Sequence, residues 1–386
     1  MKSVTTVTDY SYLVPNSGGD MSDLSFGQNI AVSDSYMAIS VIRHDSSDSN
    51  KSENSGAVYL YSLDSSGVPI VSTLRVVTPT DGSPGDLFGD PVKIVGSSLV
   101  TSSPFSSGAG KVYIYDLEDP GLGETILSPQ TGSSGDRFGC SFDMTKDGQF
   151  LFVGALGSDE FQADAGAVYC YSLTETGYEL YHILEPPRAI ADLGFGRYIE
   201  VTDDQLVVGS QDGQAVFMFD LLTLEVEDVV GSFNPYIDGF GVPIDVHEDV
   251  MVIGARDSFG GLGCAFVYYN EDGTDWVYQG LVYDKSFSSA GLGISVSVDD
   301  EHIAVSPKQT FFAGVPDQGS VVLYDYAVSD DVLDLAYNST IAVDNGAEGD
   351  FFGKRVTLDN GNIYSTALYD DTISGVDSGS VYVLPM

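Results

Sequence analysis

The hydrophobic and polar positions of the chain follow a pattern that occurs seven times. Each unit opens with a Phe-Gly step and a β-like run, and a Gly-x-Val-Tyr-like segment comes later in the same unit. The Phe-Gly anchors stand at positions 26, 88, 138, 195, 240, 292 and 352, and the sixth has Leu292 in place of phenylalanine. Self-similarity at this period is typical of repeat folds in which each unit is one supersecondary element.

The pattern within a unit predicts four strands, here called A to D. In the third unit they are DRFGCSFDM (136–144), QFLFVGAL (149–156), GAVYCYSL (166–173) and YELYHILEP (178–186). Strand C is apolar or aromatic on both faces, as expected where sheets stack face to face around an axis. The fold class predicted for residues 1–386 is therefore all-β: a single seven-bladed β-propeller of four-stranded antiparallel blades. Each phenylalanine should wedge between neighbouring blades, and each glycine should allow close backbone approach.

The two ends of the chain together make one more unit. The last anchor is followed by only 34 residues, which suffice for strands A to C, and the first anchor is preceded by 25 residues that include VTTVTDYSYLVP. We predict that residues 1–15 complete the last blade and that this N-terminal strand closes the ring, which removes exposed sheet edges.

The units resemble FG-GAP repeats, which are known from integrin α-subunit propellers and from bacterial and viral surface proteins. The match is best at residues 133–155, where Phe138-Gly139 and Val153-Gly154-Ala155 stand for the two named halves. Integrin-type repeats often carry a calcium loop of alternating aspartates between strands A and B. Turns such as Thr202-Asp203-Asp204 lack that series. No calcium site of that type is therefore expected.

The charge of the chain excludes one class of partner. Aspartate and glutamate number 57 against 15 lysines and arginines, a net charge of −42, and the basic residues are scattered along the sequence, as at Lys93, Lys111, Arg137 and Arg355. Such a surface repels phosphate backbones, so nucleic-acid binding is not expected. No apolar run approaches the roughly 18 residues that span a bilayer, so membrane insertion is not expected. No signal peptide is visible at the start.

Residues suited to catalysis are few. The four histidines lie in different repeats with no metal-ligand spacing, and no nucleophile turn or phosphate-binding glycine loop is found. We therefore predict no enzymatic activity and no cofactor. The acidic clusters Asp159/Glu160/Asp164 and Asp370/Asp371/Asp377 are candidates for weak calcium binding only. Asp86, Asp136, Asp238 and Asp350, each two residues before an anchor phenylalanine, are expected to fix turns through backbone hydrogen bonds.

The connections between strands B and C are the most variable part of the chain. In a propeller they gather on one face with the D–A connections, and loops on a rigid scaffold often carry function. Candidate partner-binding residues in these connections are Phe105, Phe161, Phe259, Phe311, Phe312, Asp159, Asp164, Asp370 and Asp371. The alternative for the aromatic residues is that they fold back over the blade edges.

These features predict a non-enzymatic structural or recognition module. The preferred interpretation is a virion or phage-type surface protein that binds a protein or glycan through one loop face, as part of a larger assembly. One alternative is a cellular adhesin or extracellular matrix-type protein. Another is a carbohydrate-active hydrolase that uses loop carboxylates. The expected location is a virion or an extracellular surface.

Overall fold

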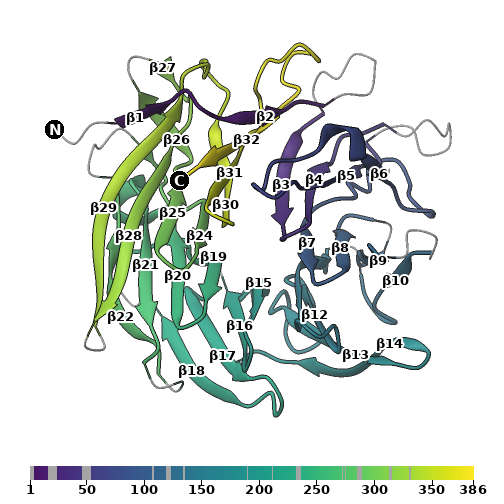
Figure 1. Cartoon of the computed structure of the whole chain (residues 1–386). Coiled ribbons are helices and arrows are strands. Elements are labelled where there is room, and N and C mark those ends of the chain that lie inside the picture. The colour runs from purple at the N-terminus through teal and green to yellow at the C-terminus, as the bar shows by residue number, and fades with distance from the viewer. Residues whose placement is uncertain are drawn as a thin grey trace. The chain divides into compact units, whose positions relative to one another are not determined.

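The fold is all-β and contains the seven blades of a β-propeller, each with four antiparallel strands, so the predicted fold class is confirmed (Figure 1). One blade carries an additional fifth strand, and one small sheet lies outside the blades. The computed structural model describes residues 4–15, 24–45, 54–106, 108–118, 123–133, 135–188, 190–210, 212–231, 236–271, 273, 275–284, 289–312, 315–329 and 332–386, without the side chains of Val4, Ser289, Phe311 and Phe312. In these ranges helical structure is limited to two short segments. Neither has the length and apolar character needed to cross a membrane.

Contacts within the chain group the residues into two compact units. Unit I comprises residues 29–65 and 69–229, and unit II comprises residues 1–28, 66–68 and 230–386. Each unit is described by itself below. The single domain expected over residues 1–386 stays a prediction.

Unit I contains most of blades 1 to 4, each with strands A to D in sheet order. Blade 1 consists of β3 (Phe26–Val32), which begins in unit II, β4 (Tyr36–Val41), β5 (Ala57–Ser62) and β6 (Arg75–Val77), with the 3₁₀ turn η1 (Val71–Thr73) before β6; blade 2 of β7 (Val92–Val95), β8 (Ser98–Ser103), β9 (Lys111–Asp116) and β10 (Thr125–Leu127); blade 3 of β11 (Phe138–Met144), β12 (Phe150–Ala155), β13 (Ala167–Thr174) and β14 (Gly177–Leu184); blade 4 of β15 (Phe195–Val201), β16 (Gln205–Ser210), β17 (Ala215–Asp220) and β18 (Val226–Gly231).

Unit II contains blades 5 to 7. Blade 5 consists of β19 (Phe240–His247), β20 (Val250–Ala255), β21 (Cys264–Tyr269) and β22 (Val277–Val282), with α1 (Ser258–Gly261) between β20 and β21; blade 6 of β24 (Ser295–Val298), β25 (His302–Ser306), β28 (Val321–Ser329) and β29 (Val332–Val343); blade 7 of β30 (Phe352–Asp359), β31 (Asn362–Ala367), β32 (Ser380–Pro385) and β2 (Ser11–Leu13). A small separate sheet is formed by β23 (Ser289–Ala290), β26 (Gln309–Phe312) and β27 (Val315–Pro316).

The N-terminal segment completes blade 7, as the sequence predicts. Strand β2 pairs antiparallel with β32 in the register Tyr12 to Tyr382, and Tyr10 packs edge-on against the Tyr382 ring at 5.3 Å between ring centroids (Figure 1). Only part of residues 1–15 has this role. Strand β1 (Val4–Val7) instead pairs in parallel with β29 and gives blade 6 a fifth strand, which the sequence pattern does not predict.

The glycine and the phenylalanine of the Phe-Gly step each have the structural role that the sequence predicts. All seven of its glycines have positive φ, between 82° and 111°, a region that glycine enters without a Cβ penalty. Phe138 is fully buried and packs edge-on against Tyr169 of its own blade at 5.3 Å between ring centroids. It also lies in one apolar cluster with Val100 and Val112 of the preceding blade. The predicted position of the anchor phenylalanine between neighbouring blades is therefore confirmed for this unit.

A second glycine joins consecutive blades. The glycine before strand C forms an isolated parallel bridge with the next anchor residue in the pairs Gly56–Phe88, Gly166–Phe195, Gly263–Leu292 and Gly319–Phe352. A Cβ on Gly166 would overlap the carbonyl oxygen of Phe195. In these four pairs the start of strand C therefore touches the start of the next strand A, and glycine leaves room for the contact.

Polar side chains on strands A satisfy backbone N–H groups of the following blade. The residue five positions after the anchor accepts an N–H bond in three cases: Asp143 from Val201 at 2.9 Å, Asp245 from Val298 at 2.9 Å and Ser297 from Leu358 at 3.0 Å. Strand A is the edge strand of its sheet, where backbone groups would otherwise lack a partner. We call this contact the inter-blade clasp.

In unit I the residues five positions after the anchors of blades 2, 3 and 4 form an ion-pair network. The Nζ of Lys93 lies 2.9 Å from a carboxylate oxygen of Asp143 and 2.7 Å from one of Glu200. The three residues come from strands A of blades 2, 3 and 4. Because Asp143 also holds the N–H of Val201, the network is explained by structure alone and does not indicate catalysis.

Candidate functional site

In unit II the B–C and D–A connections open at the same end of the blades. The bridges Gly263–Leu292 and Gly319–Phe352 place the start of each strand C beside the start of the next strand A. We call this end the loop end. It carries the B–C connections 256–263, 307–319 and 369–379, of which residues 313 and 314 lie outside the described residues.

Large apolar side chains are exposed at the loop end. In blade 7, Ile373 is 96% exposed, and Val376 and Tyr369 in the same connection are also exposed. In α1 of blade 5, Phe259 is exposed and its N–H donates to the carbonyl of Tyr236, whose side chain is 72% exposed. Such residues cost free energy in water, and they are the residue types that anchor protein partners.

A shallow depression, too small to enclose a water molecule, lies at the loop end between blades 6 and 7. Its lining includes Lys308, Gln309 and Thr310 from the start of the blade 6 connection, and Phe351, Phe352 and Lys354 from blade 7. Thr310 is buried, and its hydroxyl accepts the N–H of Gly319 at 2.8 Å. The depression is therefore lined by phenylalanines, two lysines and a buried threonine.

Lys354 lies within electrostatic range of three other basic residues. Burial lowers the pKa of Lys354, and the nearby positive charges of Arg355, Arg256 and Lys308 lower it further. These basic residues are scattered in the sequence, as expected. Arg256 and Lys308 belong to the B–C connections of blades 5 and 6, and Lys354 belongs to strand β30 of blade 7.

Two of the aspartates near blade 7 are buried. Asp370 is 6% exposed and accepts hydrogen bonds from the hydroxyls of Ser380 at 2.6 Å and Tyr382 at 3.0 Å. Burial raises the pKa of Asp370, although these hydrogen bonds oppose the shift. Burial also raises the pKa of Asp350 to about 6; the N–H of Ala347 opposes this, and Asp370 and its acidic neighbours add to it. Asp370, a candidate partner-binding residue from the sequence, is thus buried. The second candidate, Asp371, is exposed.

The turn role expected for the aspartates before the anchors holds for three of four. Asp86, Asp136 and Asp350 each accept the backbone N–H of the residue three positions earlier. Asp238 instead accepts the N–H of Gly239.

The predicted loop aromatics divide into different environments. Phe105 in unit I is exposed, and the Arg137 guanidinium lies 5.4 Å from the centre of its ring. Phe161 packs against the apolar cluster of blade 3 and so folds back over the blade. Phe259 is exposed at the loop end of unit II. Phe311 and Phe312 lie in β26, and their side chains lie outside the described residues.

The two acidic clusters do not form ligand sets. Asp159 and Asp164 are exposed, and a carboxylate oxygen of Asp159 accepts the N–H of Asp164 at 2.8 Å. Asp371 likewise accepts the N–H of Asp377 at 2.9 Å. Within the part of the chain that the structure describes, three ligand atoms converge within 4.8 Å at His247, Glu248 and Asp300 instead.

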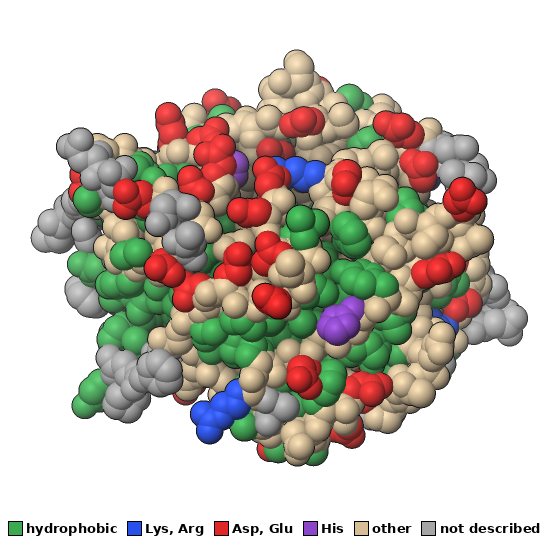
Figure 2. Space-filling model, turned by 90° about the horizontal axis from the view of Figure 1, so that it is seen from below, with side chains coloured by type: hydrophobic (Ala, Val, Ile, Leu, Met, Phe, Trp, Pro, Cys, Tyr) green, Lys and Arg blue, Asp and Glu red, His purple; other side chains and the backbone are tan. Residues whose placement is uncertain are grey.

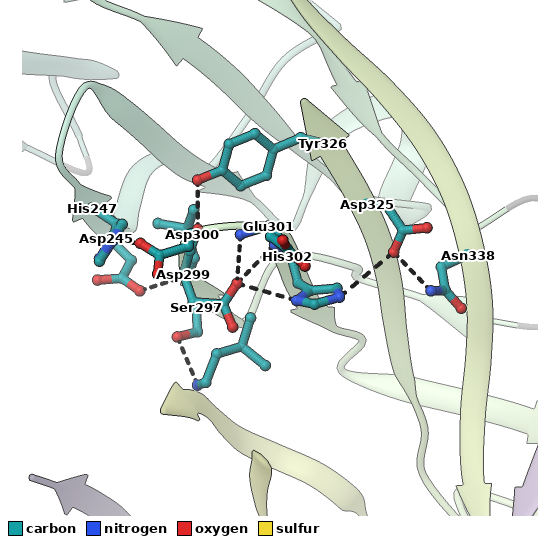
Figure 3. Close-up of polar contacts among 12 residues, drawn as sticks. Asp245, His247, Ser297, Asp299, Asp300, Glu301, His302, Asp325, Tyr326 and Asn338 are labelled. Carbon is teal, nitrogen blue, oxygen red and sulfur yellow. Dashed lines mark hydrogen bonds and ion pairs between the residues drawn. The ribbon is translucent and has the colours of Figure 1, made fainter. Parts of the chain in front are cut away.

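That trio lies at the opposite end of unit II, where strands A turn into strands B. Figure 3 shows His247 and Asp300 of this group. His247 Nε2 and a carboxylate oxygen of Asp300 are 2.7 Å apart, and they come from consecutive blades. Nearby, Asp299 holds the backbone N–H of His302 at 2.7 Å (Figure 3). Histidine with two carboxylates is a set that zinc accepts. The direct contact between His247 and Asp300 also explains the arrangement without an ion.

Replacing Asp350 by asparagine should stabilise the protein at neutral pH. A carboxyl whose folded-state pKa is about 6 rather than 3.8 favours the folded state only when protonated, so its contribution is lost as pH rises through 6. Asp350→Asn should therefore raise the free energy of unfolding by about 1–2 kcal/mol at about pH 7.5 and leave it unchanged at about pH 3, below both pKa values. Urea denaturation at both pH values measures this.

The matched control for Asp350→Asn is Asp136→Asn. Asp136 holds the equivalent turn of blade 3 with two hydrogen bonds from Ser133. Asp136 is also buried, but the Ser133 hydroxyl gives its carboxylate a second hydrogen bond, so a smaller gain is expected there. An equal gain in both variants would mean that the acidic neighbours of Asp350 contribute nothing.

Sequence reasoning missed two features at the loop end. Lys308 and Lys354 are isolated basic residues in the sequence, with no motif around them. Ile373 lies in a connection already marked as variable, and its exposure could have been suspected because an isoleucine in the segment DDTISGVDSG has no strand pattern.

Comparison with known proteins agrees with the repeat pattern. Residues 123–171 match the FG-GAP repeat family, which confirms the resemblance over that segment. The chain is 24% identical over 212 residues to integrin alpha-2 of Mus musculus, covering 48% of this chain, and 24% identical over 177 residues to integrin alpha-2 of Bos taurus, covering 39%. The matches span 18% and 15% of those relatives.

Solved structures show the same fold at low identity. The β-propeller domain of Myceliophteria thermophila Cps50 (Swd1) aligns with a TM-score of 0.58 at 10% identity, covering 98% of this chain and 100% of that one. A putative 6-phosphogluconolactonase from Bacteroides uniformis has a TM-score of 0.56 at 11% identity, covering 83% and 86%. A streptogramin B lyase has a TM-score of 0.56 at 10% identity, covering 98% of each chain. At these identities the likeness shows the fold alone.

Proposed function

We propose that this protein is a non-enzymatic recognition module that binds a protein or glycan through the loop end of unit II. The observation that carries the proposal is the exposure of Ile373, Val376 and Phe259 on loops held by a rigid scaffold. Similarity to FG-GAP repeats and to integrin alpha-2 supports a role in recognition or adhesion.

The charge of the protein supports a role outside nucleic-acid chemistry. Acidic side chains far outnumber basic ones on the face seen in Figure 2, in line with the net charge of −42. We place the module on a virion or phage-type particle or on an extracellular surface, within a larger assembly. A strongly anionic surface keeps such a protein soluble and separate from its copies.

We propose a non-enzymatic role because buried carboxylates of this protein are held by hydrogen bonds and ion pairs that stabilise the fold. Asp370 is held by Ser380 and Tyr382, and Asp143 by Lys93 and the N–H of Val201. A hydrolase would need two carboxylates that face a substrate-sized cleft. Turnover of a polysaccharide that a single Asp371→Asn change abolishes would favour the hydrolase alternative over this proposal.

The binding surface can be tested with protein-coated fluorescent beads. Beads are applied to a defined glycan panel and to intact cells of the source, with wild type compared to the double variant Ile373→Ser, Val376→Ser. Loss of two exposed apolar anchors should reduce bound beads by about tenfold. Leu222→Ser is the matched control, because Leu222 is 84% exposed on the turn between β17 and β18 of unit I. Equal adhesion of all three proteins, or equal loss in both variants, would rule out the loop end as the binding surface.

The location is tested separately. Copurification with virions would support the virion or phage-type placement. Copurification with the cell envelope would support a cellular adhesin instead.

A further inference from the structure

Three side chains of metal-binding types converge at the end of unit II opposite to the loop end. A ring nitrogen of His247 and one carboxylate oxygen each of Glu248 and Asp300 lie within 4.8 Å of one another. Among the described residues, no other group of three histidine, cysteine, aspartate or glutamate side chains comes this close. Imidazole nitrogen and carboxylate oxygen are ligands that zinc uses in proteins. The three ligand atoms therefore form a candidate metal centre.

Two short turns of consecutive blades carry these ligands. His247 ends β19 and Glu248 follows it in the turn to β20, whereas Asp300 lies in the turn between β24 and β25. The inter-blade clasp joins the two strands close to both turns: Asp245, two residues before His247, accepts the N–H of Val298, two residues before Asp300. Side chains two positions apart in a strand lie on the same side, so His247 faces blade 6 as Asp245 does. The clasp thus fixes the spacing of the ligands.

The direct contact between His247 and Asp300 is compatible with a bound ion. His247 Nε2 lies 2.7 Å from a carboxylate oxygen of Asp300 (Figure 3). Two ligands of zinc, each about 2.0–2.1 Å from the ion, are about 2.9–3.4 Å apart in octahedral or tetrahedral geometry. A proton joins the two atoms in the present contact, and metal binding displaces such a proton. The two ligands therefore need to separate by less than about 1 Å.

The surroundings of the three ligands are strongly negative. Burial raises the pKa of the Tyr326 hydroxyl, and nearby carboxylates raise it further, namely those of Asp299, Asp300, Glu248 and Glu301. In the described part of the chain, no lysine or arginine forms an ion pair with any of these four. Glu248 has no hydrogen-bond or ion-pair partner among the described residues. A divalent cation would offset the repulsion between these carboxylates.

We propose that His247, Glu248 and Asp300 bind one zinc ion, which links blade 5 to blade 6. The imidazole ligand favours zinc over calcium and magnesium, which take oxygen ligands. Because the ligands come from two turns, the site differs from a calcium loop of alternating aspartates within one turn. The zinc site is independent of the proposed function, since it lies away from the loop end and stabilises the contact between two blades.

The proposal is tested by calorimetric titration of the chelator-treated full chain with zinc chloride. Excess magnesium is present throughout, because it occupies sites made of carboxylates alone. One zinc ion per chain should bind with saturation, and the melting temperature should rise with zinc concentration because the folded site binds the ion. Binding that magnesium abolishes would contradict the proposal. One zinc ion per two chains would place the ion between molecules and would contradict it as well.

The variant Glu248→Gln separates metal binding from folding. Glutamine keeps the size of a side chain that has no described partner, so the fold without zinc should be as stable as wild type. Zinc affinity should fall by at least roughly tenfold, since loss of an outer partner of a metal ligand already costs that much. An unchanged affinity in Glu248→Gln would rule out the site.

His302→Gln is the matched control. His302 also lies between two carboxylates, with Nδ1 3.2 Å from Asp299 and Nε2 3.8 Å from Asp325. Its group does not bring three ligand atoms as close together within the described residues. Zinc affinity should therefore stay at the wild-type value, and a loss equal to that of Glu248→Gln would mean that the ion binds elsewhere in this acidic region.

NMR of the chain with ¹⁵N-labelled histidine identifies the ligands directly. Zinc should shift the ring ¹⁵N signals of His247 with saturation at one equivalent, and the other three of the four histidines should not respond. In Asp300→Asn the same shift should require roughly tenfold more zinc, because blade 6 no longer contributes a carboxylate. If His247 responds as in wild type, Asp300 is not a ligand and the link between the blades is wrong.

Discussion

Deletion of residues 1–15 is expected to lower the melting temperature of the protein sharply. The deletion removes strand β2, exposes the buried edge of β32 and takes away Leu13, which is 7% exposed. Burial of Leu13 and the packing of Tyr10 and Tyr12 on Tyr382 together stabilise the fold by about 4–6 kcal/mol. Circular dichroism during heating measures the effect.

A shorter deletion gives the control. Removal of residues 1–9 takes away β1 and its parallel pairing with β29 but keeps Tyr10 and β2. Its effect should be clearly smaller. A synthetic peptide of residues 1–15 added to the longer deletion should restore part of the lost stability. If the 1–15 deletion melts like the full chain, β2 does not complete blade 7 in solution.

Replacement of Gly166 by alanine is expected to be among the most destabilising single changes. Gly166 has a φ of +81°, and an alanine Cβ there would overlap the carbonyl oxygen of Phe195 in the next blade. Backbone strain contributes about 1–2 kcal/mol, and relief of the overlap adds about 1–3 kcal/mol. Thermal melting of the variant should show a correspondingly lower midpoint.

Gly177→Ala is the matched control in the same blade. Gly177 also has a positive φ, +113°, but no atom lies within 4 Å of the position of its added Cβ. It should show the cost of strain without the cost of overlap. Equal destabilisation by Gly166→Ala and Gly177→Ala would mean that the contact with Phe195 contributes nothing measurable.

The blades could be predicted from the sequence because their main contacts are repeated within each unit. Phe138 packs against Tyr169 of its own blade, so one phenylalanine and one aromatic strand already define the packing. The role of the N-terminus could be predicted from unit length. The parallel pairing of β1 with β29 could not, because β1 adds to the edge of a blade that is already complete.

The candidate site was predicted less well because it depends on contacts between blades. Phe259 and Asp371 were named from the sequence and are exposed. Asp370 was named with them but is buried, since Ser380 and Tyr382 on the neighbouring strand donate hydrogen bonds to it. Lys308 and Lys354 line one depression because the blade 6 connection lies beside strand β30 of blade 7, which no local pattern encodes.

The inter-blade clasp limits how freely a blade of this protein could be exchanged or duplicated. The carboxylate of Asp245 belongs to blade 5, yet the N–H that it holds belongs to Val298 of blade 6. A transplanted blade would bring the side chain that accepts a hydrogen bond from the following blade. Its own backbone N–H would still need an acceptor from the preceding blade. The unit that could be exchanged with this hydrogen bond intact therefore does not coincide with a blade. It begins at the acceptor side chain of one strand A and ends at the backbone N–H of the next strand A.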